Sequence, residues 1–141
     1  MSRPVRHRVK AGDVLPEKAG PDINKARIKM VMDAMDDVNP VHIDEELVKR
    51  MGLRGLVNQG PSNLAYITNM LTEWTGDPDC VTRMKVRFHN LVVPGDQTIA
   101  GGKVTAVHDD GTVDCDIWLR LADGTIMISG MATVAMHGPG R

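Results

Sequence analysis

The chain has 141 residues, with 17 lysines and arginines against 18 aspartates and glutamates, so its formal net charge is −1 at pH 7. This balance argues against nucleic acid as the main partner, because phosphate binding depends on clustered cations, and an aromatic content of 3% is too low for a base-stacking platform. No apolar run approaches the roughly 20 residues that cross a bilayer, so no membrane partner is expected.

The cysteines and the start of the chain indicate the compartment. Cys80 and Cys115 lie far apart and form neither a disulfide framework nor a metal-binding motif. Residues 1–8 are basic, but no apolar stretch follows them, which disfavours a secretory signal. The sequence therefore predicts a reduced, cytoplasmic protein that holds no metal.

The first half of the chain is predicted to be mainly helical. Asn24 and Asp44 are suitable N-caps for two helices, and Gly52 fits the position just after the second. A longer apolar helix has Pro61 in its first turn and Gly76 at its end, and its apolar positions indicate burial on more than one side. The predicted helices cover residues 25–34, 45–51 and 61–75.

The second half alternates apolar and polar residues, which is typical of half-buried strands. Asp109-Asp110-Gly111 and Asp123-Gly124 are hairpin signals, so the strands that they join must pair antiparallel. We expect an irregularity at Gly101-Gly102 and a short extended segment at residues 12–16. The predicted strands cover residues 81–88, 98–108, 113–121 and 126–136. These elements predict one α+β domain over residues 1–141, with an antiparallel sheet wrapped against the long helix.

An acid and an imidazole lie five residues apart, at Asp37 and His42. On an unbroken helix that spacing corresponds to roughly 140° of rotation, so the side chains would diverge. Pro40 prevents that helix, and the resulting turn can bring the pair to one water molecule. An imidazole titrates close to neutral pH, so it can accept or return a proton. The alternative is an ordinary turn, since Asp and Asn-Pro are common turn residues.

A second candidate element is Gly60-Pro61-Ser62 at the start of the long helix. A helix N-terminus offers free N–H groups with a partial positive charge, and glycine allows a ligand to approach the backbone. Such a site can stabilise an oxyanion, for example the enolate oxygen of a thioester. The alternative is that Gly60 forms a tight turn and Ser62 is simply a first-turn residue.

These stretches resemble the MaoC-like dehydratase family, which includes (R)-specific enoyl-CoA hydratases and β-hydroxyacyl-ACP dehydratase subunits. The resemblance rests on the Asp-Val-Asn-Pro-Val-His-Ile-Asp run at residues 37–44 and on Val-Asn-Gln-Gly-Pro at residues 57–61. It implies a hotdog fold, in which an antiparallel sheet wraps a long helix. It also implies a dimer, often with a sheet that continues across the interface, and a thioester substrate.

Position by position, the resemblance makes Asp37 and His42 the catalytic pair and Gly60 the backbone donor to the oxyanion. It makes Asn39 the residue that shapes the turn between the pair, and Ser62 is expected beside Gly60 at the substrate. Two positions depart from the family pattern: Asp36 stands where glycine is usual, and Gln59 stands where histidine is frequent. Both departures leave an altered substrate or a reduced activity open.

The resemblance implies an enzyme that interconverts trans-2-enoyl and (3R)-3-hydroxyacyl thioesters of coenzyme A or acyl carrier protein, through an activated water and without a cofactor. Two alternatives stay open. One is a partner subunit without its own chemistry in a heteromeric dehydratase, and the other is a thioesterase on the same fold. We expect a homodimer or a heterodimer with a related hotdog subunit. A basic stripe at Arg83, Lys85 and Arg87 is either a solvated strand face or a site of attraction for a phosphorylated or acidic acyl carrier.

Overall fold

The computed structural model describes residues 9–136, so the basic segment at residues 1–8 lies outside the described part of the chain. All three predicted helices are confirmed within one residue at each end, and a short 3₁₀ helix lies between the first two. Among residues 9–136, no helix combines the length and apolar character needed to cross a bilayer. The helices are α1 (Lys25–Ala34), the 3₁₀ helix η2 (Pro40–His42), α2 (Glu45–Arg50) and α3 (Gly60–Thr75).

The strands form one antiparallel sheet of five strands in the order β1-β3-β4-β5-β2. The four predicted strands are confirmed, and the extended segment near residue 14 contributes an isolated bridge between Val14 and Lys103. The irregularity expected at Gly101-Gly102 was wrong, because the register shifts between Val104 and Ala106 instead. The strands are β1 (Lys18–Ala19), β2 (Val81–Phe88), β3 (Thr98–Val107), β4 (Thr112–Leu121) and β5 (Ile126–Ala135).

The two glycines of β3 serve close packing instead of a bulge. A Cβ on Gly101 would lie 2.6 Å from the indole nitrogen of Trp118, which is opposite it on β4. A Cβ on Gly102 would lie 2.7 Å from the backbone oxygen of Asp116. Both distances are shorter than real Cβ contacts, so larger residues do not fit at either position.

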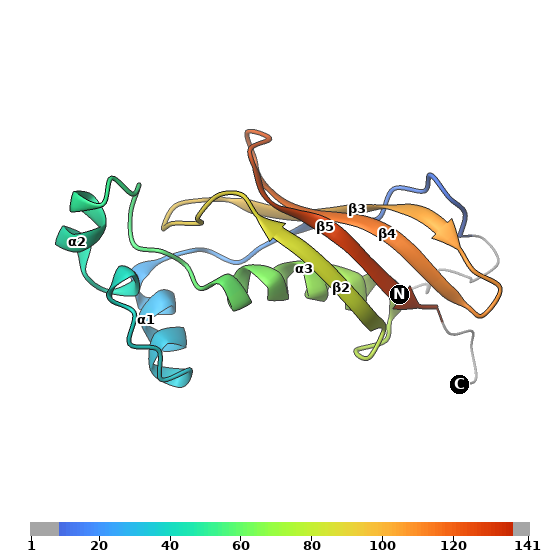
Figure 1. Cartoon of the computed structure of the whole chain (residues 1–141), viewed down its shortest axis with the longest axis horizontal. Helices are drawn as coiled ribbons and strands as arrows, with labels where there is room; N and C mark the ends of the chain where they lie inside the picture. Colours follow the sequence, from blue (N-terminus) through green and yellow to red (C-terminus); the bar gives the residue numbers. More distant parts are fainter. Residues whose placement is uncertain (1–8, 137–141) are drawn as a thin grey trace.

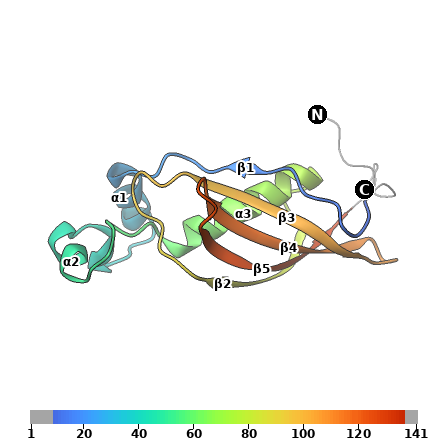
Figure 2. The same cartoon turned by 90° about the horizontal axis from the view of Figure 1, so that it is seen from above.

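Helix α3 runs along one face of the curved sheet, while α1 and α2 project past one end of it (Figures 1 and 2). One stripe of α3 faces the sheet, and the expectation of burial on more than one side was wrong for this chain: Ala65 is exposed, and Leu64 and Trp74 are only partly buried. A single sheet layer covers only one side of a helix. The buried residues of α3 are Asn63, Tyr66, Ile67, Met70 and Leu71.

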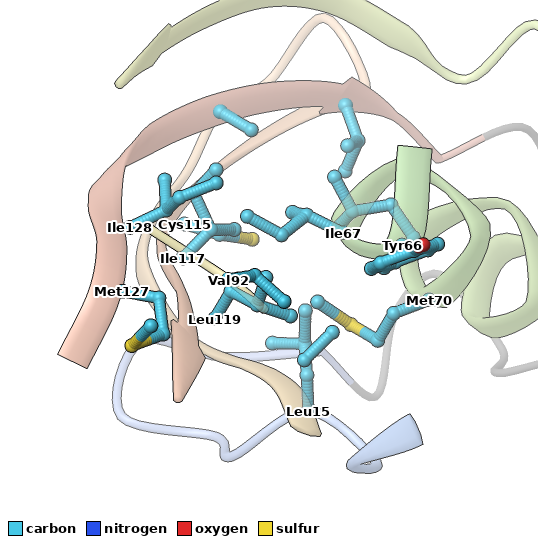
Figure 3. Close-up of a cluster of buried hydrophobic side chains, with 14 of the residues drawn as sticks. Leu15, Tyr66, Ile67, Met70, Val92, Cys115, Ile117, Leu119, Met127 and Ile128 are labelled. Atoms are coloured by element: carbon cyan, nitrogen blue, oxygen red, sulfur yellow. The ribbon is translucent and has the colours of Figure 1, made fainter. Parts of the chain in front are cut away.

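The core lies between that stripe and the inward face of the sheet (Figure 3). Ile67 and Leu71 of α3 and Leu119 of β4 are all completely buried. Along β4, alternate residues point inward, so Ile117 is buried while Asp116 is exposed, as the apolar alternation predicts. The core therefore holds α3 firmly against the sheet, with its N-terminus directed toward the projecting helices.

Candidate functional site

The turn after α1 fixes where Asp37 lies. The Asp36 N–H donates to the Asp33 carbonyl over 3.3 Å, and the Asp37 N–H donates to the Met32 carbonyl over 3.0 Å. These two bonds form a Schellman motif, in which the first residue beyond the C-cap adopts the left-handed region. Asp36 occupies that position with a φ of 51°. The backbone therefore explains why a glycine suits this position, and Asp is one of the few other residues that tolerate it.

The next turn brings the acid to the imidazole. Asp37 Oδ1 accepts a hydrogen bond from the Asn39 N–H at 2.9 Å, and Asn39 Oδ1 accepts one from the Val41 N–H at 3.3 Å. Pro40 then begins η2, which carries His42. As a result, Asp37 Oδ2 lies 3.2 Å from His42 Nε2. Asn39 shapes this turn with its side chain directed at the backbone.

The second ring nitrogen of His42 defines the tautomer. Nδ1 lies 2.6 Å from the Val57 carbonyl oxygen, which only accepts, so Nδ1 carries the proton. In the neutral ring, Nε2 then presents a lone pair toward Asp37 Oδ2. Two acceptors that face each other at this distance can be bridged by the two hydrogens of one water molecule.

The pair is protected yet reachable. The His42 side chain is 8% exposed, whereas 29% of the Asp37 side chain is exposed. The segment that carries the Val57 carbonyl is itself held in place, because the Val57 N–H donates to the Val41 carbonyl at 2.9 Å. The imidazole is therefore fixed and solvent reaches the site from the carboxylate side.

Within the described part of the chain, the N-terminus of α3 has two backbone donors without an acceptor. The first intrahelical bond runs from the Asn63 N–H to the Gln59 carbonyl, and Pro61 has no N–H, so Gly60 and Ser62 carry the N–H groups without an acceptor in the helix. The Gln59 side chain does not cap them, because its Nε2 donates to the Ile28 carbonyl at 2.9 Å. These donors are available to an external oxyanion.

Neither backbone conformation nor packing within the chain requires glycine at position 60. Gly60 is not among the glycines with a positive φ. A Cβ there would meet the Phe88 ring at 3.6 Å, which is ordinary van der Waals contact. Gly60 follows Val57 by three residues, so the two Cα atoms are at most about 11 Å apart. The N-terminus of α3 therefore lies within about 11 Å of Val57, the residue whose carbonyl binds His42.

A buried polar network supports this helix end. Asn58 Nδ2 donates to Asn63 Oδ1 at 2.7 Å and to Tyr66 Oη at 3.1 Å. The Asn58 N–H donates to the Val92 carbonyl at 2.8 Å. The Gln59 side chain is fully buried, and its Oε1 has no hydrogen-bond partner within the described residues. This network fixes the direction of the chain as it enters α3.

A second imidazole–carboxylate pair shows by contrast what makes the first suited to chemistry. His108 Nε2 lies 2.8 Å from Asp114 Oδ2, and Asp114 Oδ1 accepts from Thr133 Oγ1 at 2.7 Å. The hydrogen bond and charge of Asp114 raise the pKa of His108 above its usual value, and the bonds from His108 and Thr133 lower the pKa of Asp114. Both carboxylate oxygens of Asp114 accept hydrogen bonds, and the His108 imidazole is exposed on the outer face of the sheet. We therefore interpret this pair as a surface ion pair.

Two features of the site were missed by the sequence reasoning. The Val57 carbonyl holds His42, and no side-chain pattern marks a backbone acceptor. Phe88 shares the apolar face of its strand with Met84 and Val86, yet it is 52% exposed, with its ring beside Gly60. An aromatic residue at the end of the strand that follows the long helix was the available signal. The part of the chain between residues 9 and 136 holds no group of three potential metal ligands.

A family model described as "MaoC like domain" matches residues 12–114, whereas no curated protein matches the sequence. One chain of the ChsH1-ChsH2 complex from Mycobacterium tuberculosis is 21% identical, with 91% of this chain and 98% of that chain covered and a TM-score of 0.78. The (R)-hydratase from A. caviae involved in PHA biosynthesis is 17% identical, with 92% and 98% covered and a TM-score of 0.81.

The R-hydratase PhaJ1 from Pseudomonas aeruginosa, in its unliganded form, is also 17% identical. It covers 96% of this chain and 87% of its own, with a TM-score of 0.84. At these identities the likeness shows the fold alone, and it confirms the predicted α+β hotdog architecture.

Proposed function

The chain belongs to the MaoC-like family of hydratases and dehydratases, and from this premise we propose that it interconverts trans-2-enoyl and (3R)-3-hydroxyacyl thioesters. The observation that carries the proposal is the pair of acceptors at Asp37 and His42, 3.2 Å apart, with the imidazole tautomer fixed by Val57. That arrangement selects a water molecule with both hydrogens engaged. A lone pair of the water oxygen then points toward an incoming electrophile.

In the hydration direction, the water oxygen adds to C3 of the enoyl thioester. His42 Nε2 accepts one proton of that water, and the Asp37 carboxylate balances the positive imidazolium. The electron pair of the double bond moves to C2 and onto the thioester oxygen, which becomes an enolate. The Gly60 N–H stabilises this oxygen, with Ser62 next to it. C2 then takes up a proton from the Asp37/His42 pair, so one water is consumed and the enzyme returns to its starting state.

The role of Asn39 is to shape the turn. Its side-chain bond to Val41 and the bond between its own N–H and Asp37 Oδ1 leave Asp37 Oδ2 directed at His42. The thioester carbonyl already activates the double bond and no electrons are transferred, so the reaction is written without a cofactor. The acyl carrier is coenzyme A or an acyl carrier protein.

A partner subunit is part of the proposal. Strand β2 is at one edge of the sheet and, within residues 9–136, pairs with β5 alone, so its outer edge can continue a sheet. One of the similar structures is a complex of two differently named chains. We propose a dimer, made either with a second copy or with a related hotdog chain.

The test is the purified protein alone with crotonyl-CoA. Falling absorbance of the conjugated alkene supports the hydratase, and release of free thiol, followed with a thiol reagent, would indicate a thioesterase instead. We expect Asp37→Asn to lower hydration by about 10²–10⁴-fold while the protein stays folded. A folded Asp37→Asn variant with near-normal turnover contradicts the role assigned to Asp37. Turnover that needs a second hotdog subunit and survives Asp37→Asn in this chain supports the partner-subunit alternative.

A further inference from the structure

Residues 54–58 form a strap between the catalytic turn and the loop after β2. On the loop side, the Arg54 guanidinium donates to both oxygens of Asp96, with Nη1–Oδ1 at 3.0 Å and Nη2–Oδ2 at 2.8 Å. Arg54 Nη2 also donates to the Leu91 carbonyl at 2.9 Å. These three hydrogen bonds from one planar guanidinium fix the position of Arg54 relative to the loop more firmly than a single contact would.

On the catalytic side, the same strap holds His42. The Val57 N–H donates to the Val41 carbonyl, and the Val57 carbonyl accepts from His42 Nδ1. The neighbouring Asn58 N–H bonds to the Val92 carbonyl, in the loop that also carries Asp96. A shift of the strap relative to the loop would therefore move the carbonyl that orients the imidazole.

The Asp96 side chain is the fixed end of this attachment. It is 10% exposed, against 55% for Arg54, and its Oδ2 also accepts from the Val93 N–H at 3.0 Å. Burial opposes ionisation, but the bonds from Arg54 and from the Val93 N–H outweigh it and lower the pKa of Asp96. Asp96 therefore remains a carboxylate across the neutral range and keeps the guanidinium in place.

The ion pairs of the projecting region differ in which parts of the chain they join. Helices α1 and α2 lie beyond the end of the sheet (Figure 1), and their ion pairs Lys25–Glu45 and Lys29–Asp33 stay within the projecting region. The Arg54–Asp96 pair instead joins residues 42 positions apart and connects that region to the sheet end. The Arg54–Asp96 pair thus links the segment that holds His42 to the loop at the end of the sheet.

We propose that Arg54 and Asp96 are positioning residues: their ion pair fixes the Val57 carbonyl, and through it the orientation of the His42 ring toward Asp37. This inference rests on the proposed hydratase reaction. It predicts that breaking the pair misplaces the imidazole and lowers kcat, while substrate binding changes little, because the side-chain bonds of Arg54 and Asp96 go to each other and to the loop after β2.

The kinetic experiment compares Arg54→Ala and Asp96→Asn with wild type on the best enoyl-CoA of a panel. We expect kcat to fall by about 10- to 100-fold at a nearly unchanged KM. The double variant is expected to lose little more than the worse single variant, since both single variants break the same ion pair. Arg54→Lys keeps the charge without the planar fork and should recover part of the loss. Arg120→Ala, which breaks the Arg120–Glu17 pair on the sheet, is the matched control and should leave kcat unchanged.

A second measurement does not depend on turnover. In ¹⁵N NMR, the wild-type His42 ring should show the Nδ1–H tautomer, and Arg54→Ala should mix the tautomers and speed amide exchange at Val57 and Asn58. If wild type hydrates no enoyl thioester, the proposed function fails, and this measurement still decides whether the pair fixes His42. A normal kcat in Arg54→Ala, or a lowered kcat with an unchanged His42 spectrum, overturns the inference.

Discussion

The sheet with α3 and the projecting region of α1, η2 and α2 are held together by different forces. In the former, aliphatic side chains from distant parts of the chain interdigitate, and Ile67, Leu119 and Ile128 are fully buried. In the latter, only Ile28, His42 and Val48 are buried within the three helices. Its shape comes from caps, turns and polar bonds between residues close in sequence.

This contrast separates stability from chemistry. Burial of apolar area provides most of the free energy of folding, so substitutions in the sheet core should act on unfolding. Directional hydrogen bonds place Asp37 and His42, so substitutions in the projecting region should act on turnover. Each of the following substitutions tests one side of this division.

The largest expected effects are the loss of turnover in His42→Ala and the loss of stability in Leu119→Ala. Loss of the imidazole should lower proposed hydration by about 10²–10⁴-fold at a nearly unchanged thermal midpoint. Leu119→Ala leaves a cavity in the core and should lower the free energy of unfolding by about 2–5 kcal/mol, while the folded fraction keeps its turnover. Denaturant unfolding and enoyl-CoA assays on both variants check the pair. If both substitutions changed turnover and the free energy of unfolding to the same extent, the division between the sheet core and the projecting region would be contradicted.

Two glycines provide the next comparison. A Cβ on Gly130 would lie 2.1 Å from the Lys85 carbonyl oxygen, so Gly130→Ala must push β2 from β5 and should destabilise the protein by about 3 kcal/mol or more. Gly60→Ala meets only Phe88 at van der Waals distance, so this variant should fold normally and lose activity through crowding of the oxyanion donors. Thermal melting and initial rates distinguish the two outcomes. A folded Gly60→Ala variant with full activity would contradict the role given to Gly60.

The buried thiol of Cys115 is expected to make the stability of the core depend on pH. Burial, with the nearby charges of Asp114 and Asp116, raises its pKa from 9.0 to about 12. The unfolded thiol ionises first, so stability that is fully present below pH 9 is lost as the pH rises toward 12. At about pH 10 the loss attributable to this group is about 1.4 kcal/mol. Urea unfolding at about pH 8 and about pH 10 should show this extra loss in wild type and not in Cys115→Ala.

The smallest effect concerns the turn before Asp37. Asp36 has a left-handed backbone that glycine adopts without steric penalty, so Asp36→Gly should stabilise the protein by about 1 kcal/mol. Asp36→Ala keeps a Cβ and should bring no such gain, which makes it the matched control. A thermal midpoint that rises equally in both variants would point to the removed charge instead of the backbone.

Helix ends were predictable because their determinants are local. Asn24 and Asp44 accept hydrogen bonds from the N–H groups of Arg27 and Leu47, and Gly76 closes α3 with a φ of 72°. The same locality made the Asp37–His42 turn predictable, since the residues that shape it lie between the two.

Contacts between distant segments could not be predicted from the same signals. Arg54 and Asp96 are 42 positions apart, and nothing in their neighbouring residues indicates a pairing. The Val57 carbonyl is a backbone atom that carries no residue signature. Phe88 fits the apolar alternation of its strand, yet its ring is 52% exposed and lies beside Gly60.

The short sequence distance between Asp37, His42, Val57 and Gly60 has a consequence for how such a chain diversifies. A single recombination event that exchanges one continuous stretch would transfer all four residues of the proposed site onto another hotdog scaffold. Selection for new substrates can then act on that stretch, as long as the recipient keeps an acidic anchor in the loop that receives Arg54.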